Sequence, residues 1–340
     1  MTNGGPLHER LETALSDWLG VPHLALCGNG TMALLLPLRA LEVRGDVITT
    51  PFSFVATTNA LGWHGNRAVF ADIDPVTLTL DPDRIEAAIT PQTSAILPVH
   101  CYGNPCDMDA IESVARRHGL RVIHDAAHAF GVENAGGSIL KRGDLSAISF
   151  HATKVFNTVE GGTVICADAG MKQRIDSLKN SGIVDEVAVS GRGLNARMSE
   201  FHAAMGLAHL PHMPRVMARR QQIDRTYRAA LADLPGLEPL PKLRQTVSNH
   251  AYFPILVGPE YPLTRDALHD RMRAGNIMTR RYFLPLLSRL PDLRDHPSAD
   301  PGNLPVAHAM AERVLCLPIH PGLTPQDQIR IIAALAAPFD

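Results

Sequence analysis

Short apolar segments alternate with longer segments of helical character over the first half of the chain. Six of the apolar segments are rich in β-branched residues and are predicted to be strands: residues 47–49, 68–70, 95–99, 121–125, 147–150 and 163–166. Such alternation favours a mostly parallel sheet with helices on both faces. The chain is therefore predicted to be an α/β protein.

One helix in this region has clear boundary signals. Residues 109–119 lie between two predicted strands, and Asp107 or Asp109 could cap the start of the helix. Gly119 is placed to end it, because glycine adopts the left-handed conformation that closes many helices. The segment completes a strand–helix–strand unit.

The pattern changes after Glu200, where a second, smaller α/β domain is expected. The predicted elements are helices at 201–210 and 216–232, a strand at 252–257, a helix at 264–274, a short strand near Ile277 and a closing helix at 324–336. We expect a large domain over residues 1–215 and a small domain over residues 216–340.

Composition describes an ordinary folded protein. The 340 residues are 45% hydrophobic and 19% charged, which is enough for a large core. A formal net charge of -2 gives no bulk reason to expect nucleic acid or an anionic membrane as partner. No run approaches the roughly 18 apolar residues of a membrane span, and the start lacks a secretory pattern, so we expect the cytoplasm.

Five cysteines are scattered through the chain, an odd number that does not suggest a disulfide framework. We expect reduced thiols. His100, Cys101 and Cys106 lie close together in sequence, but no second cluster with the short spacings of a zinc site follows. No metal is expected.

Polar residues follow several predicted strands, where ligands bind in open α/β sheets. The segment 28–31, Gly-Asn-Gly-Thr, follows an apolar run and opens a helical stretch, so its backbone N–H groups could cradle a phosphate. A simple tight turn explains it equally well. It is not a dinucleotide fingerprint, because Ala33 replaces the third glycine.

Asp125 ends a strongly apolar strand. A carboxylate there is costly unless a cation meets it, and a pyridinium nitrogen would serve. Taken alone, Asp125 is better explained as a cap for the turn at Ala126–Ala127.

Lys154 follows the next predicted strand, in a stretch poor in charge. Burial lowers the pKa of a lysine and frees its amine to form an imine. The segment 28–31, Asp125 and Lys154 would meet at one sheet edge, and together they favour a site for one small anionic cofactor.

At these residues the sequence resembles the DegT/StrS family of sugar aminotransferases, which use pyridoxal 5'-phosphate (PLP). The resemblance covers nearly the whole chain and is most specific at residues 125–129, 149–162, 195–200 and 317–323. It implies PLP-dependent transferase fold type I, the aspartate aminotransferase-like fold, and a homodimer with shared active sites.

The resemblance also implies cofactor roles. Lys154 would bind PLP as a Schiff base and act as the acid–base group, with pyridoxamine phosphate as the aminated form. Asp125 would pair with the ring nitrogen and His128 would contact the phenolic oxygen. The remaining cofactor contacts would be Gly30, Thr31 and Ser149 at the phosphate, Phe54 against the ring, and Asn195 reaching the phosphate from the neighbouring subunit. Phe54 could instead be core packing, and Asn195 a turn residue.

For the substrate, the segment around Lys154 with Glu160-Gly-Gly resembles members that transfer the amino group of glutamate to carbon 4 of a nucleotide-linked, by likeness dTDP-linked, 4-keto-6-deoxyhexose. Members acting at carbon 3 tend to have tyrosine at position 151 and aspartate at position 160. The implied substrate contacts are Glu160, Arg197, Tyr282 and His320. The product would be an amino sugar, as used in O-antigen and lipopolysaccharide.

Several alternatives remain open. They are a 3-keto-sugar aminotransferase, a 4-aminotransferase for GDP- or UDP-sugars, and a catalytically silent PLP-binding regulatory protein. A sugar dehydratase is disfavoured, because such relatives replace the lysine with histidine. Two departures from the family pattern are the start directly at the segment Thr2–Pro6, which suggests a truncated N-terminal segment, and the lack of histidine at the end of the motif 280–287.

Overall fold

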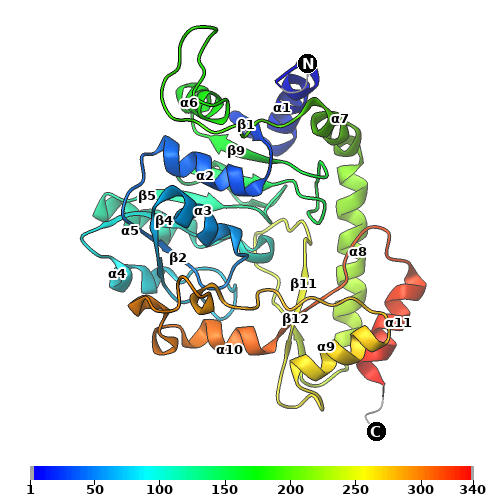
Figure 1. Cartoon of the computed structure of the whole chain (residues 1–340). Helices are drawn as coiled ribbons and strands as arrows, with labels where there is room; N and C mark the ends of the chain where they lie inside the picture. The colour runs from blue at the N-terminus through cyan, green and yellow to red at the C-terminus, as the bar shows by residue number, and fades with distance from the viewer. Residues whose placement is uncertain (1–3, 338–340) are drawn as a thin grey trace.

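The computed structural model describes residues 4–337, so Thr2 and Asn3 of the N-terminal segment lie outside it. Its centre is a seven-stranded sheet with the order β1-β9-β8-β5-β4-β2-β3 (Figure 1). The strands are β1 (His23–Cys27), β2 (Asp46–Thr49), β3 (Arg67–Phe70), β4 (Thr93–Leu97), β5 (Arg121–Asp125), β8 (Leu145–Ser149) and β9 (Gly162–Cys166). All six predicted strands are present, with ends shifted by up to two residues. The α/β prediction is confirmed.

Strand direction places the polar clusters together. β3, β2, β4, β5 and β8 pair in parallel, so their carboxyl ends lie at one edge of the sheet. β9 runs antiparallel to both β8 and β1, which gives β1 the direction of β8. The antiparallel direction of β9 was not predicted; it follows from the connection between β8 and β9, which has no crossover helix. The residues that follow β1, β5 and β8 therefore share one edge.

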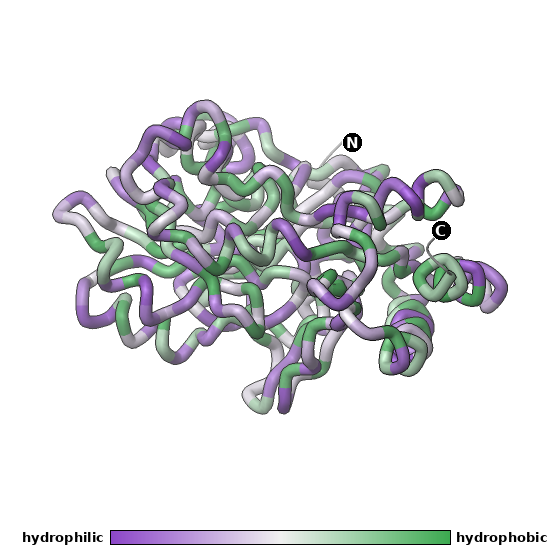
Figure 2. The backbone as a smooth tube through the Cα atoms, turned by 90° about the horizontal axis from the view of Figure 1, so that it is seen from below, coloured by the Kyte–Doolittle hydropathy of each residue, from purple (hydrophilic) through white to green (hydrophobic). Residues whose placement is uncertain are grey.

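Helices flank this sheet: α1 (Pro6–Leu19), α2 (Gly30–Ala40), α3 (Ala56–His64), α4 (Ile85–Ala88), α5 (Met108–His118) and α6 (Ala169–Lys179). The cap of α5 is Asp107, whose Oδ1 accepts from the N–H of Ala110 at 3.0 Å, and Gly119 ends the helix with a φ of 65°. Along the outer helices hydrophobic and hydrophilic residues alternate (Figure 2), as expected for helices with one buried face.

A second, antiparallel sheet has the order β10-β11-β12: β10 (Leu237–Pro239), β11 (Phe253–Val257) and β12 (Val314–Leu317). It packs with α8 (Met213–Leu231), α9 (Arg265–Ala274), α10 (Pro305–Arg313) and α11 (Pro325–Ala336), while α7 (Glu200–His209) precedes α8. A short hairpin, β6 (Glu133–Asn134) and β7 (Gly137–Ser138), lies apart from both sheets. The domain boundary at residue 215 falls in the first turn of α8 and stays a prediction.

The prediction of a strand near Ile277 is wrong. Ile277 follows a turn in which Asn276 has a φ of 55°, and its side chain packs into the core of the small sheet. Only Arg280 pairs with β12, through an isolated bridge to Cys316. The other two strands of this sheet, β10 and β12, were not predicted from the sequence pattern.

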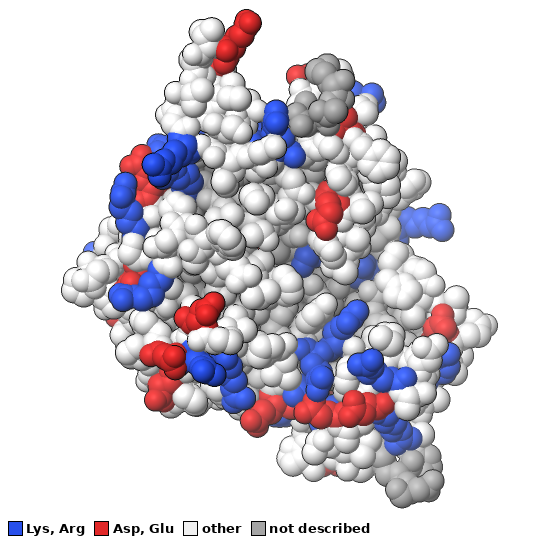
Figure 3. All heavy atoms as spheres, in the orientation of Figure 1, with Lys and Arg blue, Asp and Glu red and all other residues white. Residues whose placement is uncertain are grey.

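The distribution of charged side chains on the surface agrees with the modest net charge. Acidic and basic side chains are interspersed on the face shown in Figure 3, with no broad field of one sign. Among residues 4–337, no helix combines the length and apolar character needed to cross a bilayer. An anion would therefore have to be bound by local groups.

Glu200 joins α1 to α7. Its carboxylate accepts from the N–H groups of Gly5, Leu7 and His8 at 2.9, 3.0 and 3.0 Å. The first N–H groups of a helix have no partner within it, so this distant side chain satisfies them. Desolvation raises the pKa of Glu200, but the three donors outweigh it and the pKa is lowered.

Replacing Glu200 should therefore destabilise the protein. Glu200→Gln leaves these donors with a weaker partner, and we expect a loss of about 1 kcal/mol in the free energy of unfolding, measured by urea denaturation at neutral pH. The difference from wild type should shrink as the pH falls through the lowered pKa, where wild-type Glu200 also loses its charge. Glu9→Gln, an exposed change in α1, the helix whose start Glu200 caps, should cost less; equal losses would contradict the capping role.

Candidate active site

Asp125 ends β5 and is 4% exposed. Its Oδ2 accepts from Thr57 Oγ1 at 2.8 Å, and its Oδ1 accepts from the N–H of Ala127 at 3.1 Å. Burial raises the pKa of Asp125, while these two donors and the nearby Lys154 oppose the rise. The bond to Ala127 is the turn-capping bond that the sequence suggested, and the second oxygen is engaged by a separate element, α3.

Lys154 lies in the segment after β8. The residue as a whole is half-buried, yet its amine is sheltered, and desolvation lowers its pKa to about 8 although Asp125 opposes the shift. Its Nζ lies 3.4 Å from the hydroxyl oxygen of Tyr252. The two ionisable groups predicted from the sequence are therefore brought close enough to influence each other's pKa.

His128 lies between Lys154 and a group of aromatic rings. Its Nδ1 accepts from the N–H of Tyr102 at 3.2 Å, and its ring stacks on Phe283 with centroids 5.7 Å apart. The ring of Tyr252 meets it edge-on at 4.8 Å. Burial, followed by Lys154, holds the pKa of His128 well below its usual value, so the imidazole is neutral.

The start of α2 approaches the end of β8. A Cβ atom added to Gly30 would lie 2.8 Å from Cβ and Oγ of Ser149, so only glycine fits. The Asn29 side chain accepts from Met32 N at 2.9 Å. Within residues 4–337 the N–H groups of Gly30 and Thr31 have no acceptor. These groups, the helix dipole and Ser149 are suited to a phosphate.

The other predicted residues lie further out. Phe54 follows β2 and is 55% exposed, which excludes the core-packing alternative. Exposed Glu160 has its Oε1 3.7 Å from Nε2 of His151. Tyr282 meets the ring of Tyr252 edge-on at 5.8 Å.

His320 follows β12 and is exposed. The Asn195 backbone pairs with Asn180, and its side chain accepts from Arg197 at 3.2 Å. The carbonyl of Ala196, between them, accepts from the N–H of Gly28 at 2.7 Å, so this segment borders the predicted phosphate-binding segment 28–31.

Several residues of the site were missed by sequence reasoning. Thr57 holds Asp125, and Tyr252 contacts Lys154. Tyr102 donates its hydroxyl hydrogen to the carbonyl of Tyr282. Asn249 donates to the carbonyl of His128 at 2.8 Å. Thr57 and Tyr102 lie shortly after the predicted strands 47–49 and 95–99, a signal that could have found them, whereas Asn249 and Tyr252 come from a distant part of the chain.

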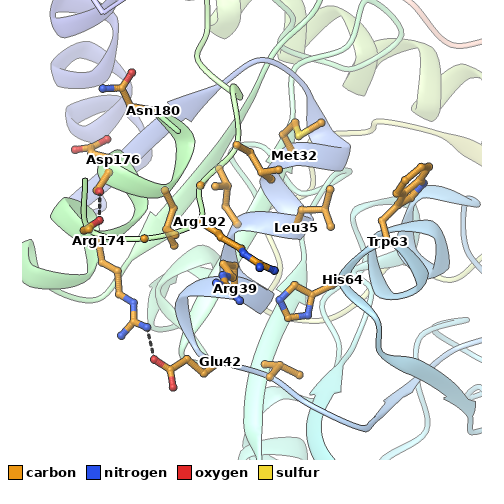
Figure 4. Close-up of a pocket in the computed structure, with 18 of the residues that line it drawn as sticks. Met32, Leu35, Arg39, Glu42, Trp63, His64, Arg174, Asp176, Asn180 and Arg192 are labelled. Carbon is orange, nitrogen blue, oxygen red and sulfur yellow. Dashed lines mark hydrogen bonds and ion pairs between the residues drawn. The ribbon is translucent and has the colours of Figure 1, made fainter. Parts of the chain in front are cut away.

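A larger groove, about 1640 Å³, lies elsewhere. Arg39 of α2, His64 of α3 and Arg192 point into it (Figure 4), and the ion pair of Arg174 with Glu42 closes one side. It touches the candidate site only at Thr31. Size alone would favour this groove as the active site, but the buried groups with shifted pKa values surround Lys154, and such groups mark functional sites more directly.

The family model for the DegT/DnrJ/EryC1/StrS aminotransferases matches residues 1–336. The chain belongs to this aminotransferase family. The resemblance found in the sequence is thereby confirmed.

Relatives in this family support the match. The chain is 49% identical to a dTDP-4-amino-4,6-dideoxy-D-glucose transaminase of Shigella dysenteriae, over 95% of this chain and 88% of the relative. It is 44% identical to the Escherichia coli protein of the same name, over 98% and 91%. The crystal structure of DesI with its TDP-sugar product superposes with a TM-score of 0.93 at 39% identity, covering 98% of this chain and 85% of DesI. The predicted fold type is confirmed.

The hydrogen bond from Thr57 to Asp125 can be tested by stability. Thr57→Val removes a donor from a buried carboxylate and should cost about 1–3 kcal/mol in urea unfolding at neutral pH. Burial raises the pKa of Asp125, so its contribution to stability is present at low pH and is lost as the pH rises through that pKa. The bond from Thr57 favours the charged carboxylate and limits this loss. Without it the loss grows, so the variant's defect should be larger at neutral than at acid pH. Thr58→Val, which loses only a 3.4 Å bond to Val55 O, is the control; equal defects would exclude a special role for Thr57.

Proposed function

We propose that this chain is a PLP-dependent transaminase that moves an amino group from glutamate to carbon 4 of a dTDP-linked 4-keto-6-deoxyhexose. The observation that carries the proposal is the buried pair of Lys154 and Asp125 at the edge of the sheet, within a chain 49% and 44% identical to two dTDP-4-amino-4,6-dideoxy-D-glucose transaminases. The product would be an amino sugar for a surface polysaccharide such as O-antigen, made in the cytoplasm.

The residues present fit PLP. Gly30, Thr31 and Ser149 would bind the phosphate, because a side chain at position 30 is excluded and the helix start offers free N–H groups. Asp125 offers a carboxylate to a cationic ring nitrogen, and neutral His128 suits an oxygen of the ring. Exposed Phe54 would cover the ring. When bound, PLP supplies an aldehyde for the amine and a ring that withdraws electrons from the adjacent carbon.

The chain's own groups then account for proton movement. A pKa of about 8 leaves part of Lys154 as the neutral amine near neutral pH, so its Nζ can take a proton and return it. Asp125, held by Thr57 and Ala127, keeps its carboxylate in a fixed position. The aromatic rings around His128 exclude water from Nζ. Glu160, Arg197, Tyr282 and His320 remain the proposed sugar and nucleotide contacts.

Lys154→Ala tests the assignment of the amine. The variant should lose turnover and the visible imine absorbance that wild type gains on mixing with PLP, and in wild type the rate of that gain should rise with pH through about 8. Lys141→Ala, at an exposed lysine, is the control. Transamination by Lys154→Ala at the wild-type rate would refute the proposal. Loading wild type with pyridoxamine phosphate and offering 4-keto and 3-keto sugars on dTDP, GDP and UDP would identify the substrate.

We also propose a homodimer with shared active sites. The loop between α6 and α7 exposes apolar side chains, with Val187 93% and Val189 65% exposed, and Trp63 beside the groove of Figure 4 is 83% exposed. Isolated large apolar side chains are ordinary, but a group of them on one face is typical of an interface. In such a dimer Asn195, at the end of this loop, would reach the phosphate site of the second copy.

Mixing two impaired variants tests the shared site. Lys154→Ala and Asn195→Ala should each lower activity. In a mixed dimer one site receives Lys154 from one chain and Asn195 from the other, and random mixing should restore about a quarter of wild-type activity. Activity no higher than the mean of the two separate variants would show that Asn195 acts within its own chain or not at all.

A further inference from the structure

Tyr252 contacts Lys154 from a distant part of the chain. It immediately precedes β11 of the small sheet, whereas Lys154 follows β8 of the large sheet, 98 residues earlier in the chain. The hydroxyl oxygen of Tyr252 lies 3.4 Å from Nζ of Lys154. This distance is at the long end for a hydrogen bond, as is common in active sites without bound substrate.

The ring of Tyr252 is held in place by its neighbours. The ring of His128 meets it edge-on at 4.8 Å, that of Tyr282 edge-on at 5.8 Å, and that of Tyr102 at a tilt with centroids 5.5 Å apart. Such aromatic contacts each add to the packing energy. The hydroxyl therefore has little freedom to turn away from Lys154.

The backbone before Tyr252 is fixed as well. Nη1 of Arg220, a buried residue of α8, donates to the carbonyls of His250, Ala251 and Ile319 at 3.2, 3.3 and 3.0 Å. One guanidinium thereby joins the segment before β11 to the segment after β12. The hydroxyl of Tyr252 is thus placed by a rigid support, which is what a group that must position another atom requires.

The hydroxyl keeps its proton under all ordinary conditions. Burial, followed by Tyr282, Cys316 and Cys101, raises the pKa of Tyr252 well above its usual value, and only Arg220 opposes this. A protonated hydroxyl can accept a hydrogen bond from the ammonium form of Lys154 and donate one to the amine form. The contact therefore persists in both states.

Little water reaches this contact. Lys154 and Tyr252 both line a cavity of about 10 Å³, room for about one water molecule. A hydrogen bond in such a place is screened less than one at the surface.

We propose that Tyr252 is a positioning residue for Lys154, whose hydroxyl holds Nζ whenever that nitrogen is not bonded to the cofactor. The catalytic consequence rests on the proposed function, while the contact itself can be tested without cofactor. Holding the free amine close to the reacting carbon shortens the search that each proton transfer would otherwise need.

The first test measures the titration of Lys154 in the cofactor-free full chain. The sequence has five lysines, so ¹³Cε-labelled lysine gives few NMR signals, and the signal missing from Lys154→Ala identifies residue 154. Wild type should titrate with a midpoint about 8. In Tyr252→Phe the midpoint should fall by about half a unit to one unit, because the hydrogen bond that the hydroxyl accepts from the charged ammonium is stronger than the one it donates to the neutral amine.

Tyr227→Phe is the matched control, because it removes another buried tyrosine hydroxyl, bonded to the carbonyl of Pro318 at 2.9 Å. It should leave the midpoint of Lys154 unchanged. An unchanged midpoint in Tyr252→Phe, or an equal fall in both variants, would overturn the proposal.

The second test is kinetic. Tyr252→Phe should lower kcat about 5- to 10-fold with little change in KM, the effect of losing one hydrogen bond that matters during proton transfer. An unchanged kcat would refute the catalytic role even if the NMR midpoint moves. If wild type transaminates no sugar, the proposed function fails, whereas a shifted midpoint in Tyr252→Phe still supports the contact.

Discussion

The structure depends on the cost of placing an amine and a carboxylate together out of water. Desolvation lowers the pKa of Lys154 and raises that of Asp125, so each group is moved toward its neutral form, while their mutual attraction opposes both shifts. With its pKa lowered to about 8, Lys154 can exchange a proton with a ligand near neutral pH. The same pair in water would be two inert ions.

The fold supports this balance with contributions from separate elements. The sheet places Asp125 and Lys154 after neighbouring strands, and Thr57 of α3 occupies one oxygen of Asp125. Tyr252, just before β11 of the small sheet, contacts Lys154, and Arg220 of α8 bonds the two carbonyls that precede Tyr252. The candidate site therefore lies between segments that follow strands of the large sheet and a segment that precedes β11 of the small sheet, and loosening either would change the environment of the amine.

Family membership and site geometry answer different questions. The match over residues 1–336 assigns the chain to the sugar aminotransferases, and it says nothing about individual side chains. The geometry shows which groups are buried and paired, but a neutral His128 and a free helix start at Gly30 would suit several phosphorylated rings. The substrate proposal therefore needs both: the relatives indicate the sugar nucleotide, and the side chains indicate the chemistry.

The sequence by itself determined the parts that depend on local order. The strands appear as short β-branched runs, and Asp125 and Lys154 could be found because Asp125 ends one run and Lys154 comes shortly after the next. The direction of β9, the strands β10 and β12 of the small sheet, and the partners Thr57 and Tyr252 were decided by the tertiary structure. Pairing between strands and contacts between residues such as 154 and 252 arise from chain segments far apart in sequence. These contacts are stabilised by burying distant segments against one another. A local pattern of residues does not specify which distant segment will provide the contact.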